Sequence, residues 1–256
     1  MTIADEVRRF WDDDSAIYDN VPNHHPTAPA ERAAWAAALT EMLPPAPARV
    51  LDCGAGTGFL SLLAARLGHQ VTALDLSPGM LARLESKAAG EGLEVEVVEG
   101  SAERPPPGPF DAVIERHLLW TLPDPLEALR AWHRSSGGGR LVLFEGMWGG
   151  HDSLERLRHR TKSTLGRVAA GRAARGAPRG GHHAEYPTSV RAAMPLGGGT
   201  SPSAVATLVA DAGWSQPRLH RLRDVEWAAS LDAPVAERIL GSSPRFAVVA
   251  GPARPS

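Results

Sequence analysis

Apolar residues change their spacing several times along the chain, and the changes predict an alternation of strands and helices. Short, densely apolar strand patterns occupy residues 49–53, 70–75, 93–100, 109–116 and 139–146. Apolar residues at helical spacing occupy 59–68, 77–90 and 124–134. Because strands and helices alternate throughout this part of the chain, we expect a parallel sheet with helices on both faces.

Local signals support the ends of these elements. Ser77 and Pro78 suit the N-cap and first turn of the second helix, and Gly90 suits its C-terminal stop. Asp124 suits the N-cap of the third helix, since Pro125 follows it. Alternating glutamates in the strand at 93–100 predict that this strand lies at an edge of the sheet.

The pattern differs on either side of this alternation. A helix is predicted over 31–43, behind an acidic and aromatic N-terminus, and residues 147–200 are rich in Arg, Gly and Pro. A helix over 201–214 and two antiparallel strands within 217–228 and 244–251 then complete the pattern.

The whole chain thus predicts a Rossmann-like, doubly wound sheet of seven strands. The sheet is mostly parallel with an antiparallel last strand, and it carries an N-terminal helical arm and a helical lid insertion. The segments we expect are an arm (1–44), a cofactor-binding core (45–146), a lid over the substrate (147–200) and a completion of the core sheet (201–256).

Composition excludes several classes of protein. With 43% apolar and 22% charged residues and a formal net charge of -2, the chain is neither disordered nor a typical nucleic-acid binder. Its single cysteine, Cys53, forms no intrachain disulfide and no cysteine-based zinc site. No signal peptide and no membrane-length apolar run is visible, so we expect a cytoplasmic protein without a membrane anchor. The sequence leaves open whether the chain forms a homodimer.

The stretch RVLDCGAGTGFL (49–60) predicts a ligand-binding turn after the first strand. Gly54, Gly56 and Gly58 let the backbone turn sharply and let a ligand approach its N–H groups. Asp75 ends the next strand, where its carboxylate can accept hydrogen bonds from both hydroxyls of a ribose. These features suit NAD as well as S-adenosylmethionine.

Two residues favour S-adenosylmethionine over a dinucleotide. Phe59 stands where the dinucleotide fingerprint requires a small residue. Asp52 lies immediately before the glycine turn, where it would repel a pyrophosphate but pair with the ammonium of a methionine group.

Four blocks of sequence, in this order, carry a resemblance to a known family: VLDCGAGTG, VTALDLSPGML, VEGSAERPPPGPFDAVIERHLLWTLPDP and GGGRLVLFEG. Together they resemble the class I S-adenosylmethionine-dependent methyltransferases, in particular the bacterial branch that acts on small molecules. The resemblance covers about residues 45–150 and says little about the substrate.

The resemblance implies roles for the matching positions. Those expected at the cofactor are Asp52, Gly54, Ala55, Gly56 and Gly58 around its methionine part, Asp75 at the ribose, Leu76, Met80, Ser101 and Ala102 around the adenine, and Arg116 closing the pocket. Family members usually carry an acid where Ser101 stands, so adenine recognition here would fall to the Ser101 hydroxyl or the Ala102 N–H.

Three histidines are candidates for a general base, because a neutral imidazole can take a proton from a substrate hydroxyl or amine. His117 follows the fourth strand at the expected pocket mouth, and His24 and His25 lie on the N-terminal arm. Each of them could instead only shape the wall or lie on the surface. The aromatic residues expected to contact a planar substrate are Trp11, Tyr18, Trp120 and Trp148.

Two other interpretations have less support. His182, His183 and Glu185 invite a metal site, but adjacent histidines do not readily point at one ion, so we expect no metal. The arginine-rich insertion lacks interleaved aromatic residues and suits the solvent side of a lid helix better than a nucleic-acid surface.

We therefore expect a methyltransferase that modifies an O, N or S atom of a small, aromatic or heterocyclic metabolite, of the kind made in natural-product biosynthesis. A catalytically silent binding or regulatory protein with the same fold is the alternative, and an NAD(P) oxidoreductase comes third.

Overall fold

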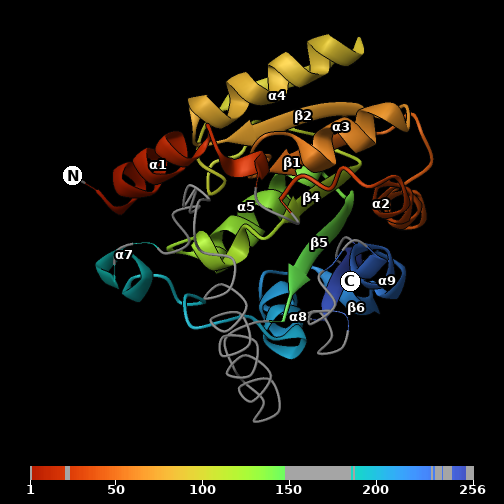
Figure 1. Cartoon of the computed structure of the whole chain (residues 1–256). Helices are drawn as coiled ribbons and strands as arrows, with labels where there is room; N and C mark the ends of the chain where they lie inside the picture. Colours follow the sequence, from red (N-terminus) through yellow and green to blue (C-terminus); the bar gives the residue numbers. More distant parts are fainter. Residues whose placement is uncertain are drawn as a thin grey trace.

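A seven-stranded sheet flanked by helices forms the centre of the computed structural model, which describes residues 2–20, 24–147, 186, 188–231, 233, 238 and 244–251 (Figure 1). The strands are β1 (Arg49–Cys53), β2 (Gln70–Asp75), β3 (Val95–Glu99), β4 (Ala112–Arg116), β5 (Arg140–Gly146), β6 (Ser215–Arg221) and β7 (Arg245–Gly251). They lie in the order β3-β2-β1-β4-β5-β7-β6, and β7 is antiparallel to both of its neighbours. The predicted fold class is confirmed, including the edge position of the glutamate-rich third strand.

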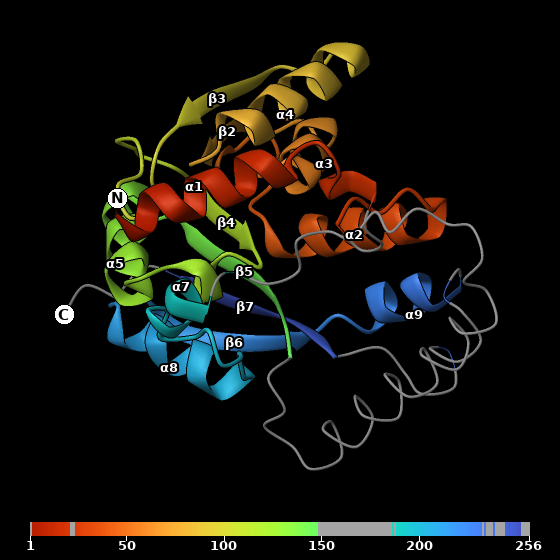
Figure 2. The same ribbon diagram turned by 60° about the vertical axis from the view of Figure 1, so that its left-hand side comes forward.

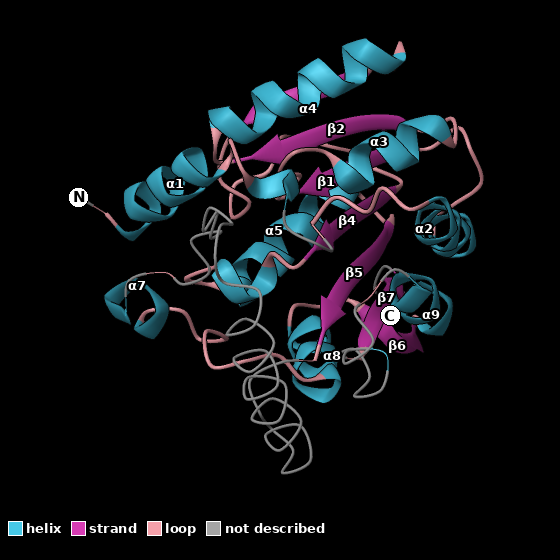
Figure 3. Cartoon of the chain, in the orientation of Figure 1, coloured by secondary structure: helices cyan, strands magenta, loops and turns pink. Residues whose placement is uncertain are grey.

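The helices predicted at 31–43, 59–68, 77–90, 124–134 and 201–214 are observed at nearly these places, and further helices lie outside these ranges (Figure 3). The α-helices are α1 (Ile3–Asp14), α2 (Pro29–Met42), α3 (Phe59–Arg66), α4 (Pro78–Glu91), α5 (Pro125–Ser136), α7 (Thr188–Ala192), α8 (Pro202–Asp211) and α9 (Arg223–Leu231). Two short 3-10 helices, η1 (Tyr18–Asn20) and η2 (Leu119–Thr121), lie in connections.

Strand β5 shows how the sheet is buried on both faces. Leu141 and Leu143 pack on the side of α5 and α8, whereas Val142 and Phe144 pack on the side of α2, α3 and α9. All four side chains are fully buried, and each such side chain contributes roughly 1.5–3 kcal/mol to stability. Continuous burial of this kind explains why the strand reads as an unbroken apolar run.

Two sequence-based predictions about element ends were wrong. Gly90 lies inside α4, and the helix ends at Gly92, which has a φ of 66° and therefore occupies the left-handed region that favours glycine. The segment 217–228 is a strand only as far as Arg221, because α9 follows from Arg223 and buries Val225 and Ala228 one helical turn apart.

The N-terminal arm lies across the carboxyl edge of the sheet, and α1 runs beside α4 (Figure 2). Asp12 of α1 accepts hydrogen bonds from the Ser77 hydroxyl (2.5 Å) and the Gly79 N–H (3.0 Å) at the start of α4. On its other side α1 packs against Tyr186 and the α7 segment through Val7, Val190 and Met194. Most of the predicted lid insertion, 148–185 and 187, lies outside the described residues.

Candidate functional site

The chain reverses its direction of strand addition between β1 and β4, and a cleft opens at that point beyond the carboxyl ends of the strands. The cleft holds about 880 Å³ of space, part of it open to solvent, and a neighbouring hollow holds about 310 Å³. Tyr18, Gly54, Gly56 and Arg116 line both, so the two form one continuous candidate site.

The turn after β1 depends on glycine for its shape. Gly54, Gly56 and Gly58 have φ values of 66°, 54° and 90°. A Cβ at Gly58 would lie 2.5 Å from Leu84 Cγ, so this position is closed by the protein itself. A Cβ at Gly56 would meet nothing within 4 Å, and Gly56 lines the cleft. The space beside Gly56 is therefore open to a ligand.

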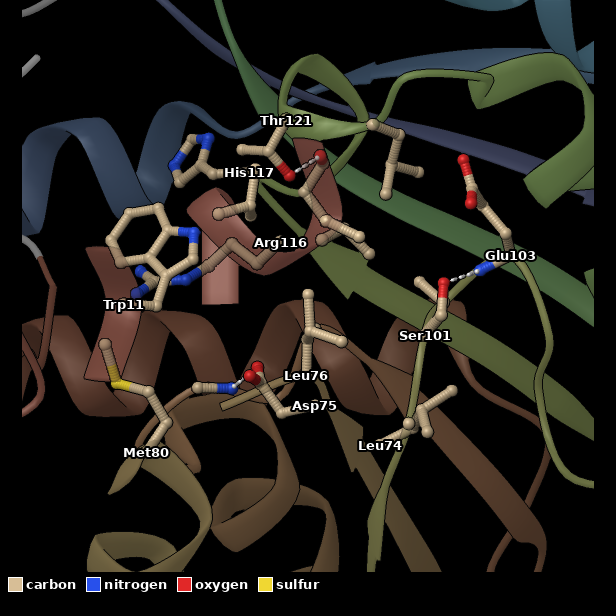
Figure 4. A pocket seen from close by; sticks show the side chains of 18 of the residues that line it. Trp11, Leu74, Asp75, Leu76, Met80, Ser101, Glu103, Arg116, His117 and Thr121 are labelled. Carbon is tan, nitrogen blue, oxygen red and sulfur yellow. Dashed lines mark hydrogen bonds between the residues drawn. The ribbon is translucent and has the colours of Figure 1, made fainter. Parts of the chain in front are cut away.

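Asp75 connects this turn to the end of β2 (Figure 4). Its two carboxylate oxygens accept hydrogen bonds from the Gly56 N–H (2.8 Å) and the Ser77 N–H (2.9 Å). Burial raises the pKa of Asp75, and these N–H donors act against the rise. The carboxyl group is thus held in one orientation at the cleft, where its remaining lone pairs can accept hydrogen bonds from a ligand.

Asp52 lines the smaller hollow at the end of β1. Its carboxylate accepts a hydrogen bond from the Ser61 hydroxyl (2.5 Å), and burial raises its pKa to about 7. A buried carboxyl group of this kind gains most by ionising when a cation lies next to it. The environment of Asp52 is compatible with the role predicted for it beside a cationic ligand group, and that role stays a prediction.

Arg116 ends β4 and lines both hollows. Its guanidinium lies 4.4 Å from the ring centroid of Phe59, and it donates a hydrogen bond to the His24 carbonyl. Burial lowers the pKa of Arg116. Phe59, which sequence reasoning used against a dinucleotide site, thus also serves as the surface on which Arg116 stacks.

His117 follows β4 with a φ of 60°, an uncommon conformation for a residue other than glycine that costs about 1–3 kcal/mol. Its side chain lines the cleft, and its Nδ1 lies 3.5 Å from Glu145 Oε2. Removal of part of the ring from water, together with the charges of Arg116 and Arg245, lowers the pKa of His117, so the ring is neutral at pH 7.

The structure adds a pair of buried acids that sequence reasoning missed. Glu115 on β4 and Glu145 on β5 are 0% and 1% exposed. Glu115 accepts a hydrogen bond from the Leu118 N–H (2.8 Å). Burial raises the pKa of both carboxyls, and the charge of Glu145 raises that of Glu115 further. The sequence offered one signal for these acids: in both VIER and LFEG, a glutamate directly follows two apolar residues near the end of a strand.

The other two histidines lie in different surroundings. The His24 ring stacks on Tyr18 (4.2 Å between centroids), and His24 lines the smaller hollow. His25 lines neither cavity, and its Nδ1 lies 3.5 Å from Lys87 Nζ. Burial and the Lys87 charge lower the pKa of His25.

Lys87 belongs to a small group that ties the N-terminal arm to the glycine turn. Its ammonium donates to the Thr57 carbonyl (2.9 Å) and pairs with Asp19 (2.6 Å), which also accepts a hydrogen bond from the Thr57 hydroxyl (2.5 Å). We call Asp19, Thr57 and Lys87 the arm anchor. Because Asp19 lies in η1, directly after Tyr18, the arm anchor holds one wall of the cleft in place.

The remaining predicted residues divide by position. Those that line the larger cleft are Trp11, Tyr18, Leu76, Met80, Ser101 and Ala102, while Ala55 lines the smaller hollow. Gly58 and Trp120 line neither, since Gly58 contacts Leu84 and Trp120 packs against Tyr186 at 5.5 Å between ring centroids. Trp148 and the His182, His183 and Glu185 cluster lie outside the described residues.

The end of the cleft near Ser101 contains a further acid. The Ser101 hydroxyl accepts a hydrogen bond from the Glu103 N–H (3.2 Å), and Glu103 lines the cleft (Figure 4). The Ala102 carbonyl accepts a hydrogen bond from the Trp132 indole (2.7 Å), which fixes the backbone at this point. The sequence analysis noted the lack of an acid at position 101, and Glu103 lies two positions beyond it.

Within the part of the chain that the structure describes, none of the helices has the length and apolar character of a membrane span. In the same described ranges, no group of three or more His, Cys, Asp or Glu residues has the arrangement of a metal site.

Comparison with known proteins shows which sequences and folds this chain resembles. Residues 51–143 match a family profile described as a methyltransferase domain. A ubiquinone biosynthesis O-methyltransferase of Xanthomonas axonopodis pv. citri (strain 306) is 44% identical over 110 residues, which cover 41% of this chain and 46% of that protein. Another, from Xanthomonas oryzae pv. oryzae (strain PXO99A), is 40% identical over 143 residues, 54% of this chain and 55% of that protein.

The chain thus spans about half the length of the curated relatives it matches. Among solved structures, phosphoethanolamine N-methyltransferase 2 of Haemonchus contortus, in complex with S-adenosyl-L-methionine, has a TM-score of 0.62 and 15% identity. The match covers 99% of this chain and 60% of that one, and at this identity it shows the shared fold.

Proposed function

We propose that this chain is a class I S-adenosylmethionine-dependent methyltransferase, and that it transfers a methyl group from S-adenosylmethionine to an O, N or S atom of a small aromatic or heterocyclic metabolite. One observation carries the proposal. The cleft joins the glycine turn and Asp75 on one side to Trp11, Tyr18 and His117 on the other, so a cofactor and an acceptor can lie end to end.

The residues present fit the cofactor. Asp75 would hold the ribose hydroxyls, since its carboxylate is fixed by two N–H donors and faces the cleft. Asp52 would pair with the ammonium of the methionine part, and the open space beside Gly56 admits the chain between them. Leu76 and Met80 would contact the adenine, with Ser101 and Ala102 at its edge.

The bound cofactor supplies an already activated methyl group, so the protein has few chemical tasks of its own. It must hold the acceptor atom about 3 Å from the methyl carbon and in line with the bond that breaks, and it must exclude water. We assign these tasks to the arm (1–44), the core (45–146), the lid (147–200) and the sheet completion at 201–256, with the arm and lid covering the acceptor.

A proton must also be removed when the acceptor is a hydroxyl, an N–H or a thiol. His117 is our first candidate for the base, because its ring is neutral and lines the cleft beside Trp11 and Tyr18. His24 lines only the smaller hollow, and His25 faces the arm anchor, so they rank behind His117.

Aromatic and apolar side chains favour a planar acceptor. Trp11 and Tyr18 line the cleft with their rings 5.8 Å apart and nearly perpendicular, and Leu118 and Leu122 add apolar surface. The O-methyltransferases among the relatives support an oxygen acceptor. We further propose that the protein is cytoplasmic and that it needs neither nucleic acid nor metal. Its oligomeric state, monomer or homodimer, can be measured directly in solution.

The experiment is methyl transfer from S-adenosylmethionine to a panel of phenols, azoles and thiols, followed by mass spectrometry of the products. We expect at least one acceptor to gain a methyl group, with formation of S-adenosylhomocysteine. The Asp75→Ala variant serves as the control for cofactor-dependent transfer. Binding of S-adenosylhomocysteine without transfer to any acceptor in such a panel would favour the alternative, a binding or regulatory protein.

A further inference from the structure

The Glu145 carboxyl group is buried at the end of a strand whose other inward side chains are apolar. It is 1% exposed at the end of β5, whose preceding residues Leu141, Leu143 and Phe144 are apolar and fully buried. Its Oε1 has no hydrogen-bond partner among the described residues. A buried polar atom without a partner costs roughly 1–3 kcal/mol, so an apolar residue would serve stability better here.

The other oxygen of Glu145 faces His117. Its Oε2 lies 3.5 Å from His117 Nδ1. The backbone N–H of His117 donates to the Phe144 carbonyl (3.1 Å), and this bond holds the backbone of His117 next to that of Glu145. The ring also lies against Gly146, because a Cβ there would be 3.5 Å from His117 Cε1. Phe144, Glu145 and Gly146 of β5 thus determine both the position and the orientation of the imidazole.

We infer that Glu145 is a positioning residue for His117, whose Nδ1–H donates to the Glu145 carboxylate so that the Nε2 lone pair faces the cleft. The inference rests on the proposed function, since it deepens the role of the same site. A carboxylate in this place selects one tautomer of the ring and stabilises the imidazolium that forms when Nε2 takes a proton.

The proton and electron balance is complete without another reactant. The lone pair of the acceptor atom forms the new bond to the methyl carbon, and the electron pair of the broken carbon–sulfur bond goes to sulfur. The acceptor proton goes to His117 Nε2 and later to water. The positive charge therefore passes from sulfur to the imidazolium, which lies beside Glu145.

Glu115 on the neighbouring strand β4 belongs to the same buried group, and the charge of Glu145 raises its pKa. Two carboxyls in one apolar interior do not both ionise readily. The charge of the one that ionises first raises the pKa of the other. The other charged groups that face this pair and the ring are Arg116 on β4, Arg245 on β7 and Asp52 on β1. Burial raises the pKa of Glu145 to about 8, so ionisation of Glu145 with rising pH should strengthen His117 as a base.

The test is the ring state of His117 in the full chain, measured by long-range proton–nitrogen NMR of protein with labelled histidine from pH 6 to 9.5. Loss of signals in His117→Asn assigns the ring. We expect the proton on Nδ1 and an inflection of the nitrogen shifts near pH 8. A proton on Nε2 would overturn the inference even if no variant of a buried acid can be purified.

Two isosteric variants sharpen the result. Glu145→Gln should remove the inflection, whereas Glu115→Gln should leave it near pH 8, because Glu115 still carries its proton when Glu145 ionises. Glu127→Gln, on the exposed surface of α5, should leave it in place. Identical titrations of His117 in the wild type and in Glu145→Gln would overturn the inference.

Kinetics with an accepted substrate give an independent readout. Glu145→Gln should lower kcat about 10–100-fold and leave the affinity for S-adenosylhomocysteine within threefold. In a His117→Ala background it should cost less than threefold further, since the two residues act as a unit. If the wild type methylates nothing, the proposed function fails while the NMR result still decides the Glu145–His117 arrangement. An undiminished kcat in Glu145→Gln would refute the inference alone.

Discussion

The two halves of the carboxyl edge of the sheet use different chemistry. At β1 and β2 the groups that face the cleft are the glycine turn and Asp75, and Asp75 is held by the N–H groups of Gly56 and Ser77. At β4 and β5 the corresponding groups are side chains, Arg116 and His117, with buried carboxyls behind them. The half at β1 and β2 is suited to bind a ligand, and the half at β4 and β5 is suited to take a proton from one.

This comparison predicts which substitutions separate binding from chemistry. The largest effect belongs to the β4 side. His117→Ala should lower turnover at least a hundredfold and leave the affinity for S-adenosylhomocysteine within a few-fold, because the ring acts on the acceptor proton. Turnover and product affinity, measured on the same preparation, check this.

A His117→Ala variant that keeps most of its turnover would make His24 or His25 the base, or leave catalysis to positioning alone. The matched control is His220→Ala on the edge strand β6, which lies away from the cleft and should behave as the wild type.

The next effect belongs to the β2 side. Asp75→Ala should weaken binding of S-adenosylhomocysteine by about 2 kcal/mol or more, roughly thirtyfold, since charged hydrogen bonds to the ribose are lost. Calorimetric titration measures the change. Glu94→Ala removes an exposed acid just before the neighbouring strand β3 and should change little, and equal affinities of wild type and Asp75→Ala would mean that the ribose lies elsewhere.

Two glycine substitutions sharpen the comparison within the turn itself. Gly58→Ala should lower the free energy of unfolding by about 1–3 kcal/mol, because a Cβ there would lie 2.5 Å from Leu84 Cγ at a φ of 90°. Gly56→Ala should cost only about 1 kcal/mol of stability, as its Cβ meets nothing, but it should weaken ligand binding more than tenfold.

Thermal unfolding and titration with S-adenosylhomocysteine, run on both variants, check this pair. If Gly56→Ala bound as tightly as the wild type, the open space beside Gly56 would not be the ligand site.

The smallest effect concerns the arm anchor. Lys87→Met removes the ammonium that bridges Asp19 and the Thr57 carbonyl, so S-adenosylhomocysteine should dissociate about two- to tenfold faster while the core stays folded. Stopped-flow measurement of the dissociation rate tests this. Arg134→Met removes the partner of an exposed pair on α5 and should leave the rate unchanged. A rate unaffected by Lys87→Met would show that the arm does not retain the ligand.

The same contrast explains what the sequence could predict. The sheet, its order of elements and the binding turn follow from local patterns: apolar runs of strand length, glycines after β1 and an acid at the end of β2. Gly92 and α9 were missed because short-range signals compete there, with two glycines close together in one case and mixed strand and helix formers in the other.

The catalytic half was only partly predictable. His117 was found from its place after a strand, but Glu145 lies 28 positions further along the chain and meets it through the pairing of β4 with β5. Such a contact depends on sheet register, which no local pattern states. Arg116 stacking on Phe59 is of the same kind, since the two residues come from β4 and α3.

The central claim is that the carboxyl edge at β1 and β2 binds S-adenosylmethionine. Its most direct test is a calorimetric titration of the purified chain with S-adenosylhomocysteine beside NADH and NADPH under identical conditions. We predict saturable, micromolar binding of S-adenosylhomocysteine alone. Binding of a dinucleotide in its place would contradict the roles of Asp52 and Asp75, and with them the proposed function.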